Sequence, residues 1–172
     1  MAVQQQKPDH TIRIALFPQD KTIKAKLVTS KGDISCDLYA GQHPLTVMNF
    51  VALATAKPPW EDESGNKHTL PYYSDLKMGT RAKGAYVATS ARPEGTAFVV
   101  PDERCKTHPP KAGAIAMVQH QPGMASAQFI LLARDIPEFN GLYPIFGQCA
   151  PIETIKTLTQ EDATLLRVEL DQ

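Results

Sequence analysis

Two apolar runs on either side of a short polar turn constrain the fold of this chain more than any other feature. The runs are Gly113–Val118 and Ala127–Leu132, and a Gln-Pro-Gly sequence lies between them. Short apolar runs of this length, bounded by proline and glycine, are typical of buried strands rather than of helices. They therefore predict two neighbouring strands joined by a turn.

Further strand-like segments extend along most of the chain. Ile23–Ser30 and Asp33–Leu38 alternate apolar and polar residues and meet at Lys31-Gly32, which predicts a tight hairpin. Similar runs are Leu76–Arg81, Ala85–Thr89 and Ile145–Cys149, a closing strand is expected through Leu166, Val168 and Leu170, and a short one over Thr11–Phe17. Lys57–Pro71 is instead predicted to be a long polar loop.

Two segments have helical spacing. Pro44 opens the first, in which Val47, Phe50, Val51 and Ala54 form one apolar stripe. Pro151 precedes the second, Ile152–Leu158. Many short strands with two separated helices predict a mostly β fold, in which an antiparallel barrel is capped by helices.

Composition narrows the class of protein. The 172 residues are 42% hydrophobic and 21% charged, as in one globular domain, and 18 basic residues balance 18 acidic ones. A neutral chain gives no electrostatic reason to bind nucleic acid or a membrane. The N-terminus has neither a basic start nor an apolar core, so we expect a cytoplasmic protein as given, or a periplasmic or secreted one if a signal peptide was removed.

The cysteines and histidines show no ligand spacing. Cys36, Cys105 and Cys149 lie far apart and form neither a zinc pattern nor a CxxC motif. Cys36 and Cys149 fall in alternating apolar runs and are predicted to be buried, reduced thiols, whereas Cys105 is the most reactive candidate. The five histidines are scattered, so we expect no metal and no cofactor.

Several short motifs follow one another in the order of a known family. In chain order they are Arg92-Pro93-Glu94-Gly95-Thr96, Met117-Val118-Gln119, Ala127-Gln128-Phe129-Ile130, Phe139-Asn140-Gly141 and Ile145-Phe146-Gly147. Together they resemble the cyclophilins over roughly Ile23 to Leu158. The resemblance implies a closed eight-stranded barrel with a helix at each mouth over residues 23–172, preceded by an extension over residues 1–22. It also implies peptidyl-prolyl isomerase activity.

That activity requires little chemistry. Rotation about a peptide bond has a barrier of about 18–20 kcal/mol, because the nitrogen lone pair is shared with the carbonyl. A catalyst needs an apolar cup for the proline ring, a donor aimed at the prolyl nitrogen, and an anchor for the neighbouring carbonyls. In the cyclophilin register Arg81, eleven positions before Arg92, takes the place of the catalytic arginine.

The same register assigns the substrate-binding positions. They are Tyr86, Val87, Thr89, Val118, Gln119, Gln128, Ile130, Phe139 and Tyr143. Several depart from the family pattern: Thr89 replaces a glutamine, Ile130 a phenylalanine, and Arg92 an aspartate. Because a threonine is too short to hold both the arginine and a substrate carbonyl, we expect reduced or altered activity, or none.

The alternative interpretation is a catalytically poor cyclophilin-like binding module. It would use the same groove, or the Lys57–Pro71 loop with Trp60, to hold a partner. In either case the expected partners are proline-containing peptides or proteins, and we expect a monomer. We also expect weak or absent cyclosporin binding, because Glu138 stands where cyclosporin-binding relatives carry a tryptophan whose indole N–H donates to the drug.

Overall fold

The computed structural model describes residues 18–97, 99–103 and 108–171. The expected strand over Thr11–Phe17 and the expected reactive Cys105 therefore lie outside the described residues. The elements are β1 (Ile23–Thr29), β2 (Gly32–Leu38), α2 (Pro44–Thr55), β3 (Trp60–Glu61), β4 (Lys67–His68), β5 (Leu76–Lys77), β6 (Arg81–Ala82), β7 (Tyr86–Ala88), β8 (Val100–Pro101), β9 (Ala114–Gln121), β10 (Met124–Leu132), a 3-10 turn (Pro137–Phe139), β11 (Ile145–Ala150), α3 (Ile152–Leu158) and β12 (Thr164–Leu170).

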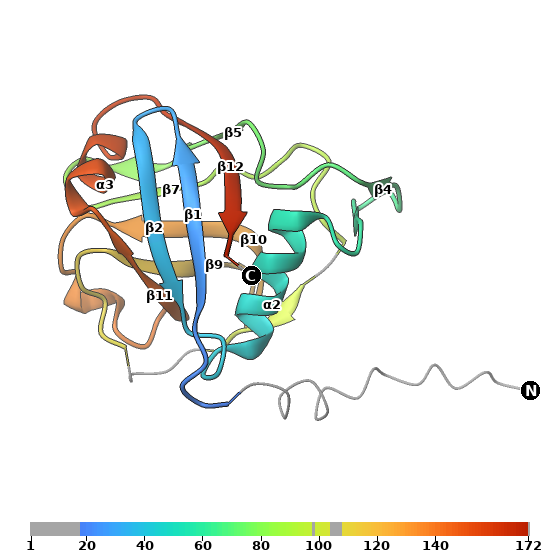
Figure 1. Cartoon of the computed structure of the whole chain (residues 1–172), viewed down its shortest axis with the longest axis horizontal. Coiled ribbons are helices and arrows are strands. Elements are labelled where there is room, and N and C mark those ends of the chain that lie inside the picture. Colours follow the sequence, from blue (N-terminus) through green and yellow to red (C-terminus); the bar gives the residue numbers. More distant parts are fainter. Residues whose placement is uncertain (1–17, 98, 104–107, 172) are drawn as a thin grey trace, which may run out of the picture.

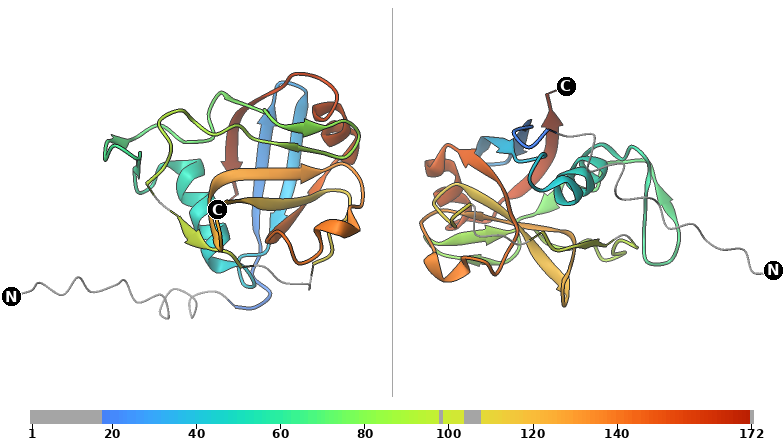
Figure 2. Two further views of the ribbon diagram at one scale, coloured as in Figure 1. Left: turned by 180° about the vertical axis from the view of Figure 1, so that it is seen from behind. Right: turned by 90° about the horizontal axis from the view of Figure 1, so that it is seen from below.

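Ten of the strands form one antiparallel sheet. Its order is β5-β12-β1-β2-β11-β9-β10-β7-β6, with β8 paired to β10. Figure 1 shows β1, β2 and β12 crossing β9 and β10, and the same crossing is seen from behind in Figure 2. The predicted hairpin, both strands around the Gln-Pro-Gly turn, and the mostly β class are confirmed.

The closed barrel of eight strands needs a correction. The sheet is strongly curled, and its two ends approach each other in a single segment: β5 pairs with β12, whereas β6 pairs with β7. Met78, Gly79 and Thr80 interrupt that segment. Gly79 has no room for a side chain, since a Cβ there would lie 2.2 Å from the Ser90 hydroxyl oxygen. The predicted continuous strand Leu76–Arg81 is thus broken, and the fold is a half-barrel.

The two helices lie at different ends of the curled sheet, as Figure 1 shows. Both begin where the prolines predict, at Pro44 and directly after Pro151. α2 directs Phe50 into the interior, and the Glu103 carboxylate accepts hydrogen bonds of 2.6 Å from both the backbone N–H and the hydroxyl of Thr46 at its start. Among the described residues, no helix has the length and apolar character needed to cross a membrane.

Alternation along the strands builds the interior. On β10, Phe129 and Leu131 have no exposed surface and join the main core cluster. Phe129 meets Phe50 edge-on, with ring centroids 5.7 Å apart, and Tyr73 at 5.3 Å. The Tyr73 hydroxyl is satisfied inside this core by the Ala127 carbonyl at 2.6 Å.

Cys36 and Cys149 form a disulfide, which corrects the prediction of reduced thiols. They are cross-strand partners in the β2–β11 ladder and both are 2% exposed. The sequence hides this pairing because 113 residues separate them, and only the order of strands in the sheet makes them neighbours.

The segment predicted as a polar loop contains a short hairpin, which we call the arm (residues 60–68). Figure 2 shows it projecting beyond α2. Trp60 is buried: its ring stacks on His68 with centroids 4.0 Å apart, and its N–H donates to the Leu70 carbonyl at 2.8 Å. Asp62 accepts from His68 and from backbone N–H groups within the turn, and these hydrogen bonds lower the pKa of its carboxyl to about 2.

Candidate functional site

Five side chains form an apolar cup on the outer surface of the sheet. Tyr86, Val118, Phe139 and Tyr143 are partly exposed there, and Ile130 is 5% exposed beneath them. Phe139 lies at the centre of the aromatic contacts, 5.7 Å from Tyr86 and 4.9 Å from Tyr143 between ring centroids. A partly exposed apolar cluster of this kind can bind an apolar ring.

Strand register explains why these residues meet. Ile130 on β10 pairs with Ala88 on β7 and with Ala116 on β9, and paired residues point to the same face of a sheet. The two alanines leave space above them, and the 3-10 turn brings Phe139 over it. The cup thus depends on small residues in the strands and on aromatic residues that come from elsewhere in the chain.

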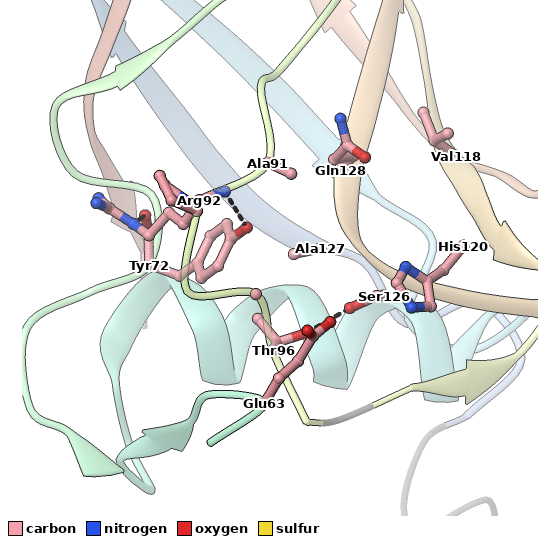
Figure 3. A pocket seen from close by; sticks show the side chains of 12 residues that line it. Glu63, Tyr72, Ala91, Arg92, Thr96, Val118, His120, Ser126, Ala127 and Gln128 are labelled. Carbon is pink, nitrogen blue, oxygen red and sulfur yellow. Dashed lines mark hydrogen bonds between the residues drawn. The ribbon is translucent and has the colours of Figure 1, made fainter. Parts of the chain in front are cut away.

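A polar pocket continues from the cup. It has a volume of about 150 Å³ and is lined by Glu63, Tyr72, Ala91, Arg92, Pro93, Gly95, Thr96, Val118, His120, Ser126, Ala127 and Gln128 (Figure 3). Val118 belongs to both regions, and Gln128 lies two residues before Ile130 on the same face of β10. The cup and the polar pocket are therefore neighbours, and we call the two together the groove.

Sequence reasoning missed most of this pocket. The acid Glu63 comes from the arm, which has no hydrophobic periodicity to indicate where it docks. His120, one of the scattered histidines, is exposed on β9 and forms one wall. On the opposite wall, only the segment Arg92–Thr96 had been singled out, by its match to the cyclophilin register.

Gln128 and Thr89 hold one another rather than competing for substrate. The Gln128 side-chain amide donates to the Thr89 carbonyl at 2.9 Å, and the Thr89 hydroxyl accepts from the Phe129 backbone N–H at 3.2 Å. Thr89 has no exposed surface. Its short side chain is used inside the sheet, so it does not present a polar group to the groove.

Val87 is likewise fully buried, in the main core cluster. It precedes Ala88, which faces the cup, so alternation turns Val87 inward. The predicted substrate contacts of Val87 and Thr89 are corrected on this ground: neither side chain offers surface to a peptide. Gln119 is exposed on β9, one residue beyond Val118.

Arg81 is not brought to the cup. It pairs with Val87 across the β6–β7 ladder, whereas its neighbour Ala82 pairs with Tyr86 and packs on the cup side. The Arg81 guanidinium lies 2.8 Å from the carboxylate of Asp162, a residue that is 99% exposed. Hydrogen bonding and charge from Arg81 lower the pKa of the Asp162 carboxyl. In this arrangement the arginine points toward the loop that follows α3.

No cluster of three or more metal-binding side chains is found among the described residues. The cup offers an apolar surface, and the polar pocket offers backbone and amide dipoles, the carboxylate of Glu63 and the guanidinium of Arg92.

Comparisons with known proteins place this chain in a family. The family model described as cyclophilin type peptidyl-prolyl cis-trans isomerase matches residues 24–164. A peptidyl-prolyl cis-trans isomerase of Helicobacter pylori is 30% identical over 144 residues, which cover 80% of this chain and 79% of the relative. Peptidyl-prolyl cis-trans isomerase A of Mycobacterium tuberculosis is 27% identical over 139 residues, covering 77% and 76%.

The fold agrees with these matches. A crystal structure of a Cryptosporidium parvum cyclophilin type isomerase superposes with a TM-score of 0.72 at 19% identity, covering 88% of this chain and 99% of the other. A second structure of that isomerase, in the presence of the dipeptide Ala-Pro, gives a TM-score of 0.71. This chain belongs to the cyclophilin-type peptidyl-prolyl cis-trans isomerase family. It is a divergent member, because the register departs from the family pattern at Thr89, Arg92 and Ile130.

Proposed function

We propose that this chain catalyses cis–trans isomerisation of X–Pro bonds in peptides and unfolded protein chains, with the proline ring held in the apolar cup. The observation that carries the proposal is the groove itself, in a chain that belongs to an isomerase family. Tyr86, Ile130 and Phe139 offer an apolar surface that is partly open to solvent, and polar groups lie directly beside it.

The groove suits a reaction that makes and breaks no covalent bond. X–Pro isomers differ by only about 0.5–1 kcal/mol, so a catalyst has to lower the barrier and not shift the balance. Binding the ring in the cup fixes one side of the amide. The second N–H of the Gln128 amide, which Thr89 does not use, and the backbone around Gln119 then anchor neighbouring carbonyls, so that the twisted amide is bound more tightly than the planar one.

Arg81 is the proposed donor to the prolyl nitrogen, and it has to leave Asp162 to act. Two features make this movement inexpensive. Asp162 is almost fully exposed to water, where ion pairs contribute little. β6 is also a two-residue strand at the edge of the sheet, so its side chains are not enclosed by a further strand.

An NMR exchange assay on Ala-Pro-Phe peptides tests both the activity and the role of Arg81. We expect measurable acceleration by the wild-type protein, and Arg81→Ala to lower kcat/KM by about 10²–10³, the usual effect of removing one transition-state donor. Lys83→Ala is the matched control, because it removes an exposed cation from the same hairpin turn.

The outcomes separate the hypotheses. Unchanged activity in Arg81→Ala would exclude Arg81 as the donor while leaving the isomerase function intact. If the wild-type protein binds the peptide but does not accelerate exchange, even at high concentration, the binding-module alternative replaces the proposed function.

We propose further that the protein is a monomer that binds cyclosporin weakly or not at all. Glu138 is exposed directly before Phe139 at the rim of the cup, where an ionised carboxylate cannot donate a hydrogen bond to the drug. Calorimetric titration with submicromolar affinity would contradict the weak binding of cyclosporin. Light scattering that gives a dimer mass would contradict the monomer.

The compartment is a separate proposal. The Cys36–Cys149 disulfide favours an oxidising location, periplasmic or extracellular, over the cytoplasm, where thiols are kept reduced. Thiol titration of denatured protein, isolated from its natural source under alkylating conditions, tests this. Full alkylation of Cys36 and Cys149 would support a cytoplasmic location instead.

A further inference from the structure

The polar pocket has a wall that comes from the arm. Two backbone hydrogen bonds fasten the arm to the loop on the opposite side: Ala97 N–H donates to the Glu61 carbonyl at 2.9 Å, and Glu63 N–H to the Glu94 carbonyl at 3.3 Å. The Asp62 carboxylate holds the arm's turn by accepting from the Ser64 and Asn66 N–H groups, each at 2.9 Å. Glu63 is therefore held in position by its neighbours on both sides.

Gly95 allows the Glu63 side chain to lie across the loop. A Cβ at Gly95 would stand 2.6 Å from the carboxyl carbon of Glu63, and Gly95 has a φ of +65°, which side chains rarely adopt. Figure 3 shows the Glu63 carboxylate next to the hydroxyls of Thr96 and Ser126, below the space bounded by Gln128 and His120.

The two oppositely charged side chains that line the pocket do not pair with each other. Glu63 is the only carboxylate among the lining residues, and Arg92 the only fixed cation. The Arg92 guanidinium is already engaged, because it donates to the carbonyls of Tyr72 and Ser74 and lies 5.5 Å from the Tyr72 ring centre. Figure 3 shows it pointing away from Gln128 and His120, so it does not neutralise Glu63 inside the pocket.

The pocket can accept hydrogen bonds from a substrate side chain that carries donors. The Gln128 amide N–H₂ donates to Thr89, which leaves its oxygen as an acceptor beside the cup. A lysine or arginine carries only donors, and its apolar stem can lie along Tyr72 and Ala127 while the charged end reaches Glu63. A glutamate or aspartate would instead face a like charge.

The distance between the cup and the polar pocket determines which substrate residue reaches the pocket. Gln128, at the pocket, and Ile130, at the cup, are two residues apart on β10, and an extended peptide advances by about 3.3 Å per residue, as a strand does. A peptide whose proline occupies the cup thus places a residue one or two positions away at the polar pocket.

We propose that Glu63 makes this groove selective for substrates with a lysine or arginine one or two residues from the proline. This inference rests on the proposed isomerase function and assigns its specificity to a residue of the arm. A partly exposed pair of this kind is expected to give a preference of about fivefold.

The test uses matched peptides that carry Lys, Met or Glu at one position, one or two residues before or after a single proline. Met has a stem similar to that of Lys without its charge. Both kcat/KM by NMR exchange and Kd by NMR titration are measured for the wild-type protein, Glu63→Gln and Glu63→Lys. Glu94→Gln is the control, because it removes a neighbouring exposed carboxylate that does not line the pocket.

In the wild-type protein we expect Lys peptides to exceed Met peptides by about fivefold at one of these positions, and Glu peptides to be the poorest. Glu63→Gln brings the Lys-to-Met ratio close to one, Glu63→Lys favours Glu peptides, and Glu94→Gln keeps the wild-type ratio. A Lys preference that survives Glu63→Gln, or no preference in the wild-type protein, overturns the proposal.

The Kd series distinguishes failure of this inference from failure of the proposed function. If no peptide is isomerised but the charge preference appears in Kd and disappears in Glu63→Gln, Glu63 sets specificity in a binding groove. If isomerisation occurs without a charge preference, the function stands and the role of Glu63 is rejected.

Discussion

The two faces of strand β10 differ in exposure: the inner face belongs to the core and the outer face to the groove. On its inner face Phe129 and Leu131 are fully buried among the aromatic rings of the core. On its outer face Ile130 lies under partly exposed side chains such as Phe139, and Gln128 lines the polar pocket. Because alternate residues serve the two faces, the same strand supplies stability on one side and a binding groove on the other. Stability and activity should then respond to different substitutions.

The disulfide gives the largest expected effect on the interior. Removing it in the double variant Cys36→Ala/Cys149→Ala should lower the free energy of unfolding by about 4–5 kcal/mol, because the bond closes a loop of 113 residues in the unfolded chain. Urea unfolding measures this, with the wild-type protein in reductant as the control. Peptide binding below the unfolding transition should be unchanged, and a weakened Kd would show that the two regions are coupled.

The interior ring of Phe129 is next. Phe129→Ala should lower the free energy of unfolding by about 3–5 kcal/mol. The substitution deletes a ring that has no exposed surface and that contacts Phe50 and Tyr73. Thermal and urea unfolding test the size of the loss. Phe129→Leu, which refills part of the space, should recover much of it. Loss of peptide affinity without loss of stability would contradict the separation of the two faces.

The two faces also differ in how far the sequence predicts them. Alternation and prolines predict the hairpin of β1 and β2, and α3 with both its ends, because these depend on neighbours in the chain. The disulfide and the arm's docking depend on which distant strands and loops become neighbours, and no local pattern carries that information.

The candidate site shows the same limit at single residues. The family register predicted a cup at Tyr86, Val87, Ile130 and Phe139, and the structure brings all of these except Val87 together. It could not say that Val87 turns inward or that Arg81 pairs with Asp162, because a register gives positions and not side-chain directions. Glu63 lies in a segment without periodicity, so nothing marked it as a pocket residue.

Protonation of a buried histidine probes the interior by pH. Burial, with a smaller contribution from His108, lowers the pKa of His43 to about 4 from an ordinary value of 6.5. Between these values the unfolded chain binds a proton that the folded protein does not. Stability should therefore fall as pH drops from 6.5 toward 4, by at most about 1.4 kcal/mol per pH unit, and be insensitive to this group above 6.5.

Urea unfolding from pH 4.5 to 7.5 measures that slope, and His43→Asn should flatten it. Asparagine suits this position because His43 is the residue before the first turn of α2, where asparagine is favoured. Asp62 does not interfere, since the lowered pKa of its carboxyl affects stability only below its ordinary value of 3.8. A slope that persists in His43→Asn would assign the pH dependence to other groups.

The smallest expected change in stability comes from the outer face, and it tests the comparison most directly. Phe139→Ala should cost only about 1–2 kcal/mol in unfolding, because the ring is partly exposed and its main partners are Tyr86 and Tyr143. The same variant should raise KM for proline peptides about tenfold, since it removes a wall of the cup and with it apolar contact to the proline ring.

Leu142→Ala is the matched control: it deletes a large side chain three residues away that is 53% exposed, and it should change neither quantity. If Phe139→Ala unfolds as easily as Phe129→Ala, the outer cluster is a second core and not a binding surface. If it is stable and KM is unchanged, the proline ring binds elsewhere in the groove.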